Sequence, residues 1–261
     1  MLVAAWNVNS IRARVDHVRQ WLQANQPDAL LLQETKVEDH AFPQAVFLDL
    51  GYTLTLYGQK TYNGVAIFTK GAVSDIQRGL PAPDFPAPYA NHCRVLGVTY
   101  QGVRLYSVYA PNGKAPDDPA FQYKEHWYQR FGQYLQQRYT AQDAVLLGGD
   151  FNIAPQPQDV ADPVAMARGC GFHPAERAWL EAFQARLGWV DSYRVHQPQG
   201  QAYSWWDYRE NSLRRDRGMR IDQLWLTPAL ATRTTASGID KAPRTWDKPS
   251  DHTVIWVRVG V

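Results

Sequence analysis

The sequence is poor in cysteine and has no long apolar run. Its two cysteines, Cys93 and Cys170, are too few for a disulfide framework, so we expect a reducing, cytoplasmic setting. No apolar stretch approaches the roughly 20 residues of a membrane-spanning helix, so we expect no membrane contact. The chain opens on a short strand-like run and lacks the pattern of a secretory signal peptide.

A strong excess of charge and several signature motifs are also missing. The formal net charge is +2, so any nucleic-acid contact would need a local cluster of positive charge. The sequence has no H-E-x-x-H or C-x-x-C zinc motif, no Walker A loop and no G-x-S-x-G elbow. These absences argue against a zinc site of those kinds, P-loop nucleotide hydrolysis and serine esterase chemistry.

Length and composition describe an ordinary globular protein. The chain has 261 residues, of which 45% are hydrophobic and 20% are charged. No low-complexity linker or charge block divides it, so we expect a single domain over residues 1–261. The proline-rich stretch from Leu80 to Pro88 is interpreted as a surface loop.

Apolar periodicity predicts a mixture of strands and helices. A helix that Ser10 caps would carry Ile11, Val15, Val18 and Leu22 on one face. Further helices are predicted over 119–139 and 174–187. Strands are predicted over 2–7, 29–33, 52–57, 65–69, 94–100, 103–109, 144–148, 203–206, 221–227, 232–238 and 253–259. Because strands and helices do not alternate strictly, we favour packed sheets covered by helices.

Oxygen-bearing side chains stand where several predicted strands begin or end. Asn7 and Glu34 follow two apolar strands, and Asp251 precedes the last one. Hard oxygen donors suit Mg²⁺ or Mn²⁺ better than zinc. Each residue also has a simpler interpretation: Glu34 could cap a helix or pair with Lys36, and Asp251 could cap a turn. Their recurrence at strand ends favours a metal site.

The segment Gly148-Gly149-Asp150-Phe151-Asn152 is a second candidate. Glycines allow a tight turn and close approach to a ligand. Asp150 could act as a general base on a water that Asn152 also holds, if burial or neighbouring charge raises its pKa. The alternative is a structural Asx turn after a strand.

His252 lies beside Asp251 at the start of a strand. It could contact a phosphate oxygen and stabilise developing charge, with Asp222 behind it to orient the imidazole. The alternatives are a structural hydrogen bond for His252 and a buried salt bridge to an arginine for Asp222.

Taken together, these segments resemble the exonuclease III family of DNA-repair nucleases, within the wider endonuclease/exonuclease/phosphatase superfamily. The matching segments occur in family order over nearly the whole chain. They are Trp6-Asn7-Val8-Asn9-Ser10-Ile11-Arg12, Leu32-Gln33-Glu34-Thr35-Lys36, Gly64-Val65-Ala66-Ile67, Tyr109-Ala110-Pro111-Asn112, Gly149-Asp150-Phe151-Asn152-Ile153, Ser204-Trp205-Trp206-Asp207-Tyr208-Arg209, Arg220-Ile221-Asp222 and residues 248–252.

The resemblance implies a fold and a metal site. The fold would be a DNase I-like, four-layer α/β sandwich of two mixed sheets with helices outside. Glu34 would be the main ligand of Mg²⁺ or Mn²⁺, with Asn7 and Asp251 close by. A second ion, drawn in some relatives, would lie near Asp150, Asn152 and His252. Some animal relatives have an acid where Asn9 stands, which leaves the choice between one ion and two open.

The resemblance also implies catalytic roles. Asp150 would activate or position the attacking water, and Asn152 would help to hold the transition state. Tyr109 would contact the phosphate. His252, steadied by Asp222, would touch a non-bridging oxygen.

The resemblance implies duplex DNA with abasic sites, nicks or blocked 3′ ends as the partner, and we expect the protein to be a monomer. Trp205, Met219 and Ile221 would line a pocket for a base-free sugar, and Asn112 would lie at the DNA. Further DNA contacts are expected from an arginine cluster that could otherwise be a solvated loop: Arg209, Arg214, Arg215, Arg217 and Arg220.

Three functions compete on these residues. The first is a Mg²⁺-dependent nuclease of base excision repair, with 3′→5′ exonuclease, abasic-site endonuclease and 3′-end-cleaning activities. The second is a phosphoesterase of the superfamily that acts on a non-nucleic phosphate ester. The third is a binding or scaffold protein that has lost catalysis. All the expected acids and the histidine are present, which favours an enzyme.

Overall fold

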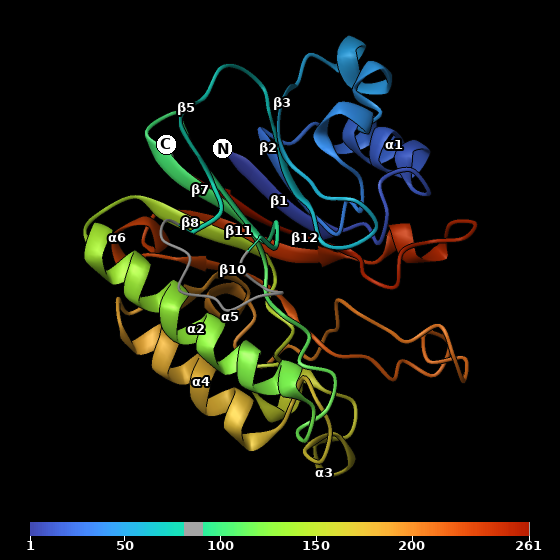
Figure 1. The fold of residues 1–261 in the computed structure, drawn as a ribbon, viewed down its shortest axis with the longest axis vertical. Coiled ribbons are helices and arrows are strands. Elements are labelled where there is room, and N and C mark those ends of the chain that lie inside the picture. The colour runs from blue at the N-terminus through green and yellow to red at the C-terminus, as the bar shows by residue number, and fades with distance from the viewer. Residues whose placement is uncertain (81–90, 261) are drawn as a thin grey trace.

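Two mixed sheets packed face to face form the centre of the molecule (Figure 1). The structure is a computed structural model, and it describes residues 1–80 and 91–260. Each sheet has six strands, and helices cover the outer faces. The predicted four-layer α/β sandwich is therefore confirmed. Within the described part of the chain, no helix is long and apolar enough to cross a bilayer.

The first sheet contains both ends of the described chain. Its central strands β1 and β2 are parallel, and its other neighbouring pairs are antiparallel. The strand order is β11 (Thr234–Asp240), β12 (Val254–Val259), β1 (Leu2–Asn7), β2 (Ala29–Gln33), β4 (Val65–Thr69) and β3 (Thr53–Tyr57).

The second sheet repeats this plan, with β7 and β8 as its parallel pair. The remaining neighbours are antiparallel. The strand order is β5 (Ser74–Arg78), β6 (Val95–Tyr100), β7 (Val103–Tyr109), β8 (Val145–Asp150), β10 (Asp222–Leu226) and β9 (Val190–Asp191).

The helices are divided between the two outer faces. The first sheet is covered by α1 (Val15–Asn25) and the 3-10 helix η2 (Gln44–Leu50), whose apolar side chains pack on its strands. The second is covered by α2 (Pro119–Arg138) and α4 (Pro174–Ala185). The shorter elements are α3 (Pro163–Met166), α5 (Ser192–His196), α6 (Pro228–Ala231), η1 (Asp39–Ala41), η3 (Pro157–Asp159) and η4 (Ala242–Thr245).

The glycine pair before Asp150 lies inside β8, not in a turn. A Cβ at Gly148 would meet Leu224 and Leu31 at 2.6 Å, and one at Gly149 would meet the Val108 carbonyl oxygen at 2.0 Å. These glycines therefore permit close packing of β8 against its neighbour β7 and against the other sheet. The expectation of a glycine turn at this point is wrong.

Most predicted elements are found within about two residues of their expected ends. Ser10 does not cap α1, because the helix starts only at Val15 and Ser10 has a φ of 91°. The strand over 203–206 is wrong: Trp205 makes single bridges to Met219 and His252, so this segment crosses between the sheets. Strands β5 and β9 and the short helices were not predicted. Most of the loop from Leu80 to Pro88 lies outside the described residues.

Candidate active site

The polar strand ends converge on one rim of the sandwich. Tyr109 and Asp150 end the parallel strands β7 and β8 and are register partners. Asp222, which begins the antiparallel strand β10, pairs with Asp150 from the other side. From the first sheet, Asn7 ends β1, and Glu34 directly follows β2. His252 reaches the same place two residues before β12.

Asn7 joins the two sheets through its side-chain amide. The amide nitrogen donates to Oε1 of Glu34 at 2.8 Å and to Oδ2 of Asp150 at 2.9 Å. The amide oxygen accepts from the backbone N–H of Asn9. In this arrangement the amide nitrogen of Asn7 faces the carboxylates, and the expected role of Asn7 at a metal stays a prediction.

Three side chains could hold a metal ion. Ligand atoms of Glu34, Asp150 and His252 lie within 4.8 Å of one another, and this is the one such group among the residues described. Lys36 forms a 2.8 Å salt bridge with Glu34, so the simpler interpretation, in which Glu34 pairs with Lys36, is confirmed. The two carboxylates are hard oxygen donors that fit a divalent cation, and the imidazole could join them only in its neutral form.

Asp251 is not part of this group, and its expected place near Glu34 at the metal stays a prediction. Its two oxygens accept hydrogen bonds from Asn9 and from the Trp205 indole, each at 2.9 Å. Burial alone would raise the pKa of Asp251, but the positive His252 and these hydrogen bonds outweigh it and lower the pKa. Asp251 thus stays ionised and fixes Asn9 and Trp205 at the rim.

Asp150 has the properties of a general base. It is 1% exposed. Burial, partly offset by the positive charge of His252, raises its pKa to about 7, and the carboxylates of Asp222 and Glu34 also contribute. Its oxygens accept from the Asn152 backbone N–H and from Asn7. A carboxyl group whose pKa lies near neutrality can exchange a proton at physiological pH.

His252 is held from behind by Asp222. The Nδ1 atom of the imidazole lies 2.9 Å from Oδ2 of Asp222, and the Nε2 atom lies 3.7 Å from Oδ2 of Asp150. Burial opposes the charged imidazole, but Asp222 and Asp150 outweigh it and raise the pKa of His252 to about 10. His252 therefore presents a positive Nε2–H to the site.

Ser204 completes this arrangement, although the sequence did not single it out. Its hydroxyl donates to Asp222 at 2.6 Å and accepts from the backbone N–H groups of Ile221 and Asp222. The only available signal was its position at the start of the segment Ser204-Trp205-Trp206, where a short polar residue precedes two aromatic ones.

Asn152 and Tyr109 flank Asp150. Asn152 has a φ of 53°, and its amide donates to the Ala110 carbonyl and accepts from Asn112. Burial, then the Glu34 charge, raises the pKa of the Tyr109 phenol well above its ordinary value, so Tyr109 acts as a neutral hydroxyl. The Arg94 guanidinium lies 4.7 Å from the centre of the Tyr109 ring.

An apolar cluster lies beside the rim. Met219 and Ile221 pack with Ala154, Val160 and Phe172, and Trp205 covers them. The neighbouring cleft, of about 700 Å³, runs from α3 to the segment 207–217, and Trp205, Arg209 and Arg217 are among the residues that line it. The residues expected to line a sugar pocket are thus gathered next to the acids.

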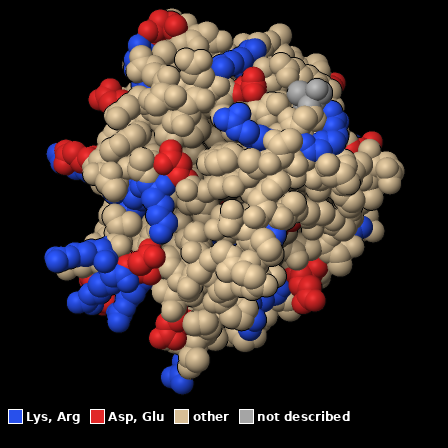
Figure 2. All heavy atoms as spheres, turned by 180° about the vertical axis from the view of Figure 1, so that it is seen from behind, with Lys and Arg blue, Asp and Glu red and all other residues tan. Residues whose placement is uncertain are grey.

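The expected arginine contacts fall into two groups. Four of them, Arg209, Arg214, Arg215 and Arg217, are exposed on the segment 207–217, which projects at the right of Figure 1. Figure 2 shows basic side chains gathered at this projection, with acidic ones among them. Arg220 is different. It is 1% exposed and pairs with Asp159 at 2.6 Å and with Asp191 at 2.7 Å, so the expectation that it touches DNA is wrong.

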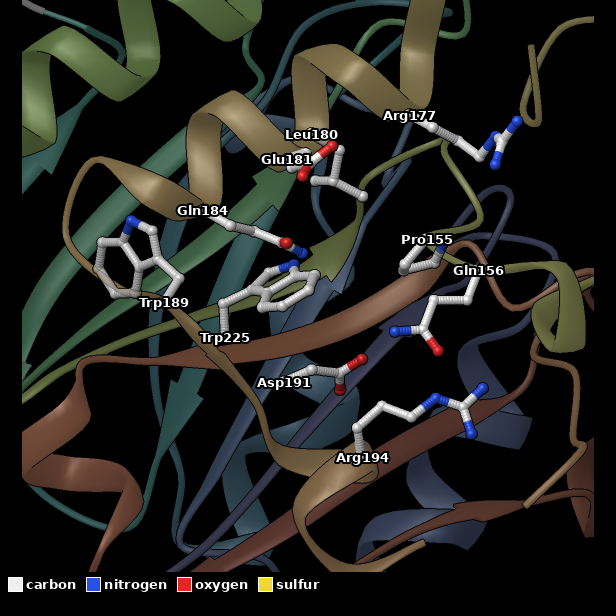
Figure 3. A pocket seen from close by; sticks show the side chains of 10 residues that line it. All are labelled: Pro155, Gln156, Arg177, Leu180, Glu181, Gln184, Trp189, Asp191, Arg194 and Trp225. Carbon is white, nitrogen blue, oxygen red and sulfur yellow. The ribbon is translucent and has the colours of Figure 1, made fainter. Parts of the chain in front are cut away.

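A second cavity lies away from the acids. It has a volume of about 420 Å³ and is lined by α4, the entry to β9 and Trp225 of β10. Figure 3 shows Asp191 and Arg194 on the side opposite Glu181. Asp191 pairs with Arg220, and Arg194 pairs with Asp159, so this cavity borders the ion-pair network that holds Arg220.

Known proteins are similar to this chain in both sequence and fold. The model of the endonuclease/exonuclease/phosphatase family matches residues 4–252. The chain belongs to this family. An exodeoxyribonuclease III of Haemophilus influenzae is 33% identical over 98% of each chain. An AP endonuclease of Archaeoglobus fulgidus is 35% identical with a TM-score of 0.95, and both chains are covered completely.

Another structure of the same fold contains DNA. A 3′ phosphatase from Neisseria, bound to a product DNA hairpin, is 36% identical to this chain with a TM-score of 0.93 over the full length of both. This membership in the endonuclease/exonuclease/phosphatase family agrees with the resemblance that the sequence motifs indicated.

Proposed function

We propose that this protein is a metal-dependent phosphodiesterase of DNA repair, of the exodeoxyribonuclease III type. The observation that carries the proposal is the meeting of Glu34, Asp150 and His252 at one rim, from distant parts of the chain. The similarity to an exodeoxyribonuclease III, an AP endonuclease and a 3′ phosphatase over the full chain supports it. We further propose that residues 1–261 act as one domain and as a monomer in the cytoplasm.

The cofactor we propose is Mg²⁺, or Mn²⁺, held by Glu34 with Asp150 nearby; His252, while protonated, would face the phosphate and not the ion. Such an ion, when bound, neutralises charge on the phosphate. A hard divalent ion suits the two carboxylates, and it would compete with Lys36 for Glu34.

Asp150 is the group that accepts a proton from the attacking water. Its carboxylate is buried, has a pKa near neutrality and is aimed by Asn7 and by the Asn152 N–H. His252, kept positive by Asp222, donates from Nε2 to a non-bridging oxygen, and Tyr109 and Asn152 hold the phosphate beside it. Attack of the water oxygen on phosphorus breaks the bond to the 3′ oxygen, which takes a proton from solvent to become a 3′-hydroxyl and leaves a 5′-phosphate on the other strand end.

The substrates we propose are duplexes with abasic sites, nicks or blocked 3′ ends. Trp205, Met219 and Ile221 would receive a base-free sugar, and Asn112 and the exposed arginines would contact the backbone. Arginine side chains bind phosphates through paired N–H groups, which suits this role.

One gel assay tests this proposal. Duplexes with an abasic site, a recessed 3′ end or a 3′-phosphate are incubated with the protein, with and without Mg²⁺. We expect Mg²⁺-dependent cleavage of at least one of them. Absence of cleavage on all three, together with turnover of an inositol phosphate, would establish the alternative of a phosphoesterase with a non-nucleic substrate.

A further inference from the structure

A fully buried lysine lies directly behind the candidate site. Lys124 comes from α2, and its side chain and that of Glu176 are both 0% exposed. Its ammonium donates to Oε1 of Glu176 at 2.5 Å and to the backbone carbonyls of Asn152 at 2.7 Å and Asn112 at 3.0 Å. An ammonium group has three protons, so each of them has an oxygen acceptor.

Glu176 extends this connection to a third loop. Its Oε2 atom accepts from the backbone N–H groups of Gly171 at 2.6 Å and His173 at 3.0 Å. It lies in the first turn of α4, which packs beside α2 (Figure 1). The ion pair therefore joins two helices to the loops that follow β7 and β8 and to the loop that enters α4.

The backbone of Asn152 shows why this connection matters. Its φ of 53° is a left-handed conformation, which surrounding contacts must hold in place. The N–H bonds to Asp150, and the side-chain amide bonds to Ala110 and Asn112. The carbonyl is the remaining polar group, and Lys124 binds it.

We propose that Lys124 and Glu176 are positioning residues for phosphodiester cleavage, which act through Asn152 and Asn112. This inference rests on the function proposed above. A buried ion pair is weak as an explanation of stability, because well-packed apolar side chains of similar size often stabilise as much. The Lys124 ammonium instead binds the backbone carbonyls of Asn152 and Asn112 directly, and these bonds fix the direction in which the two asparagine side chains point.

The test removes both charges together. Lys124→Met/Glu176→Gln keeps the side-chain volumes close to the original and leaves no unpaired buried charge. We expect a melting temperature near that of the wild type and a kcat on the abasic duplex that falls about ten- to hundredfold. KM should rise by a smaller factor than kcat falls, because the exposed arginines are untouched and Asn112 is the only proposed DNA contact that the substitution displaces.

Two comparisons separate positioning from general damage. Leu135→Ala removes a buried side chain from the same helix without touching Asn152, so it should lower the melting temperature and leave kcat near wild type. In an Asn112→Ala/Asn152→Ala background, the paired substitution should lower kcat less than about twofold, because both side chains that it positions are already gone. A wild-type kcat in the paired variant, or an equal fold loss in both backgrounds, would overturn the inference.

The outcome is distinct from failure of the proposed function, which would appear as an inactive wild-type protein in the same assay. If the Met/Gln pair does not fold, Lys124→Gln/Glu176→Gln replaces it, since the two amides can bond to each other. A wild-type kcat in this variant, or an equal fold loss in both backgrounds, would again overturn the inference.

Discussion

Nδ1 of His252 lies 2.9 Å from Oδ2 of Asp222, and the two residues belong to different sheets. His252 stands before β12 of the first sheet, and Asp222 begins β10 of the second. The contact can form only when the two sheets are correctly packed against each other. It therefore links correct folding to the presence of a positive imidazole beside Asp150.

The first prediction concerns the pH dependence of stability. The pKa of His252 is raised to about 10 in the folded protein, so its stabilisation is complete below about 6.5, the unfolded value, and is lost as the pH rises through 10. In metal-free protein, urea unfolding between pH 7 and pH 10 should show a loss of roughly 2–4 kcal/mol from this group.

Asp222→Asn should flatten that dependence, because it removes the main charge that holds the proton on His252. The difference in unfolding free energy between pH 7 and pH 10 should be smaller in the variant than in the wild type. An identical pH dependence in both proteins would mean that Asp222 does not set the charge of the imidazole.

The second prediction concerns Asp150. Asp150→Asn should lower kcat by roughly 10²- to 10⁴-fold, because an amide cannot accept the proton of the attacking water. Circular dichroism should show an intact fold. Glu181→Gln, an exposed acid on α4 far from the rim, is the matched control and should keep wild-type turnover. Normal cleavage by Asp150→Asn would remove Asp150 from the mechanism.

The sequence predicted the acids better than their surroundings. Apolar strands next to them in the sequence made three acids and one histidine easy to find: Glu34, Asp150, Asp222 and His252. The direction of the Asn7 amide could not be predicted, because both of its ends are polar and only the neighbouring carboxylates decide which end faces them. The sequence alone also does not show that Glu34, Asp150 and His252 lie close together in space. A metal site could be predicted only because polar residues recur at the ends of apolar strands.

Buried charges were the hardest features to predict. Arg220 stands in an arginine-rich stretch, and its sequence context resembles that of its exposed neighbours, yet it is buried and pairs with Asp159 and Asp191. Lys124 falls in an amphipathic helix where lysine normally faces water. In both cases the partners come from distant segments, so spacing along the chain carries no signal.

The third prediction separates surface arginines from Arg220. Arg214→Ala/Arg215→Ala should reduce the slope of log K against log salt for DNA binding by up to about 2, since each lost phosphate contact contributes about 0.9. Fluorescence anisotropy at several salt concentrations measures this slope. An unchanged slope would count against the projecting segment as a DNA contact.

Arg220→Met should behave in the opposite way. Because it leaves Asp191 buried without its ion partner and Asp159 with Arg194 alone, it should lower the free energy of unfolding by roughly 3–5 kcal/mol. The salt slope of DNA binding should stay at the wild-type value. A reduced slope in a folded Arg220→Met protein would restore Arg220 as a DNA contact.

The fourth prediction concerns Asn9, which stands between the two sides of the site. Its amide nitrogen donates to Asp251 at 2.9 Å, and its amide oxygen accepts from Lys36 at 2.5 Å. Asn9→Asp would keep the contact with Lys36, place a carboxylate against Asp251 and add a negative charge beside Glu34. We expect divalent-ion affinity to rise about tenfold, because ligand charge tunes such sites.

The same change should weaken the metal-free protein, because two carboxylates then face each other at hydrogen-bond distance. Calorimetric titration with Mn²⁺ measures the affinity, and urea unfolding in EDTA measures the stability. Asn9→Ala is the matched control, since it removes both hydrogen bonds without adding charge. If Asn9→Asp bound Mn²⁺ no more tightly than Asn9→Ala, a negative charge at position 9 would have no effect on the ion. The ion would then have to lie on the Asp150 side of Glu34.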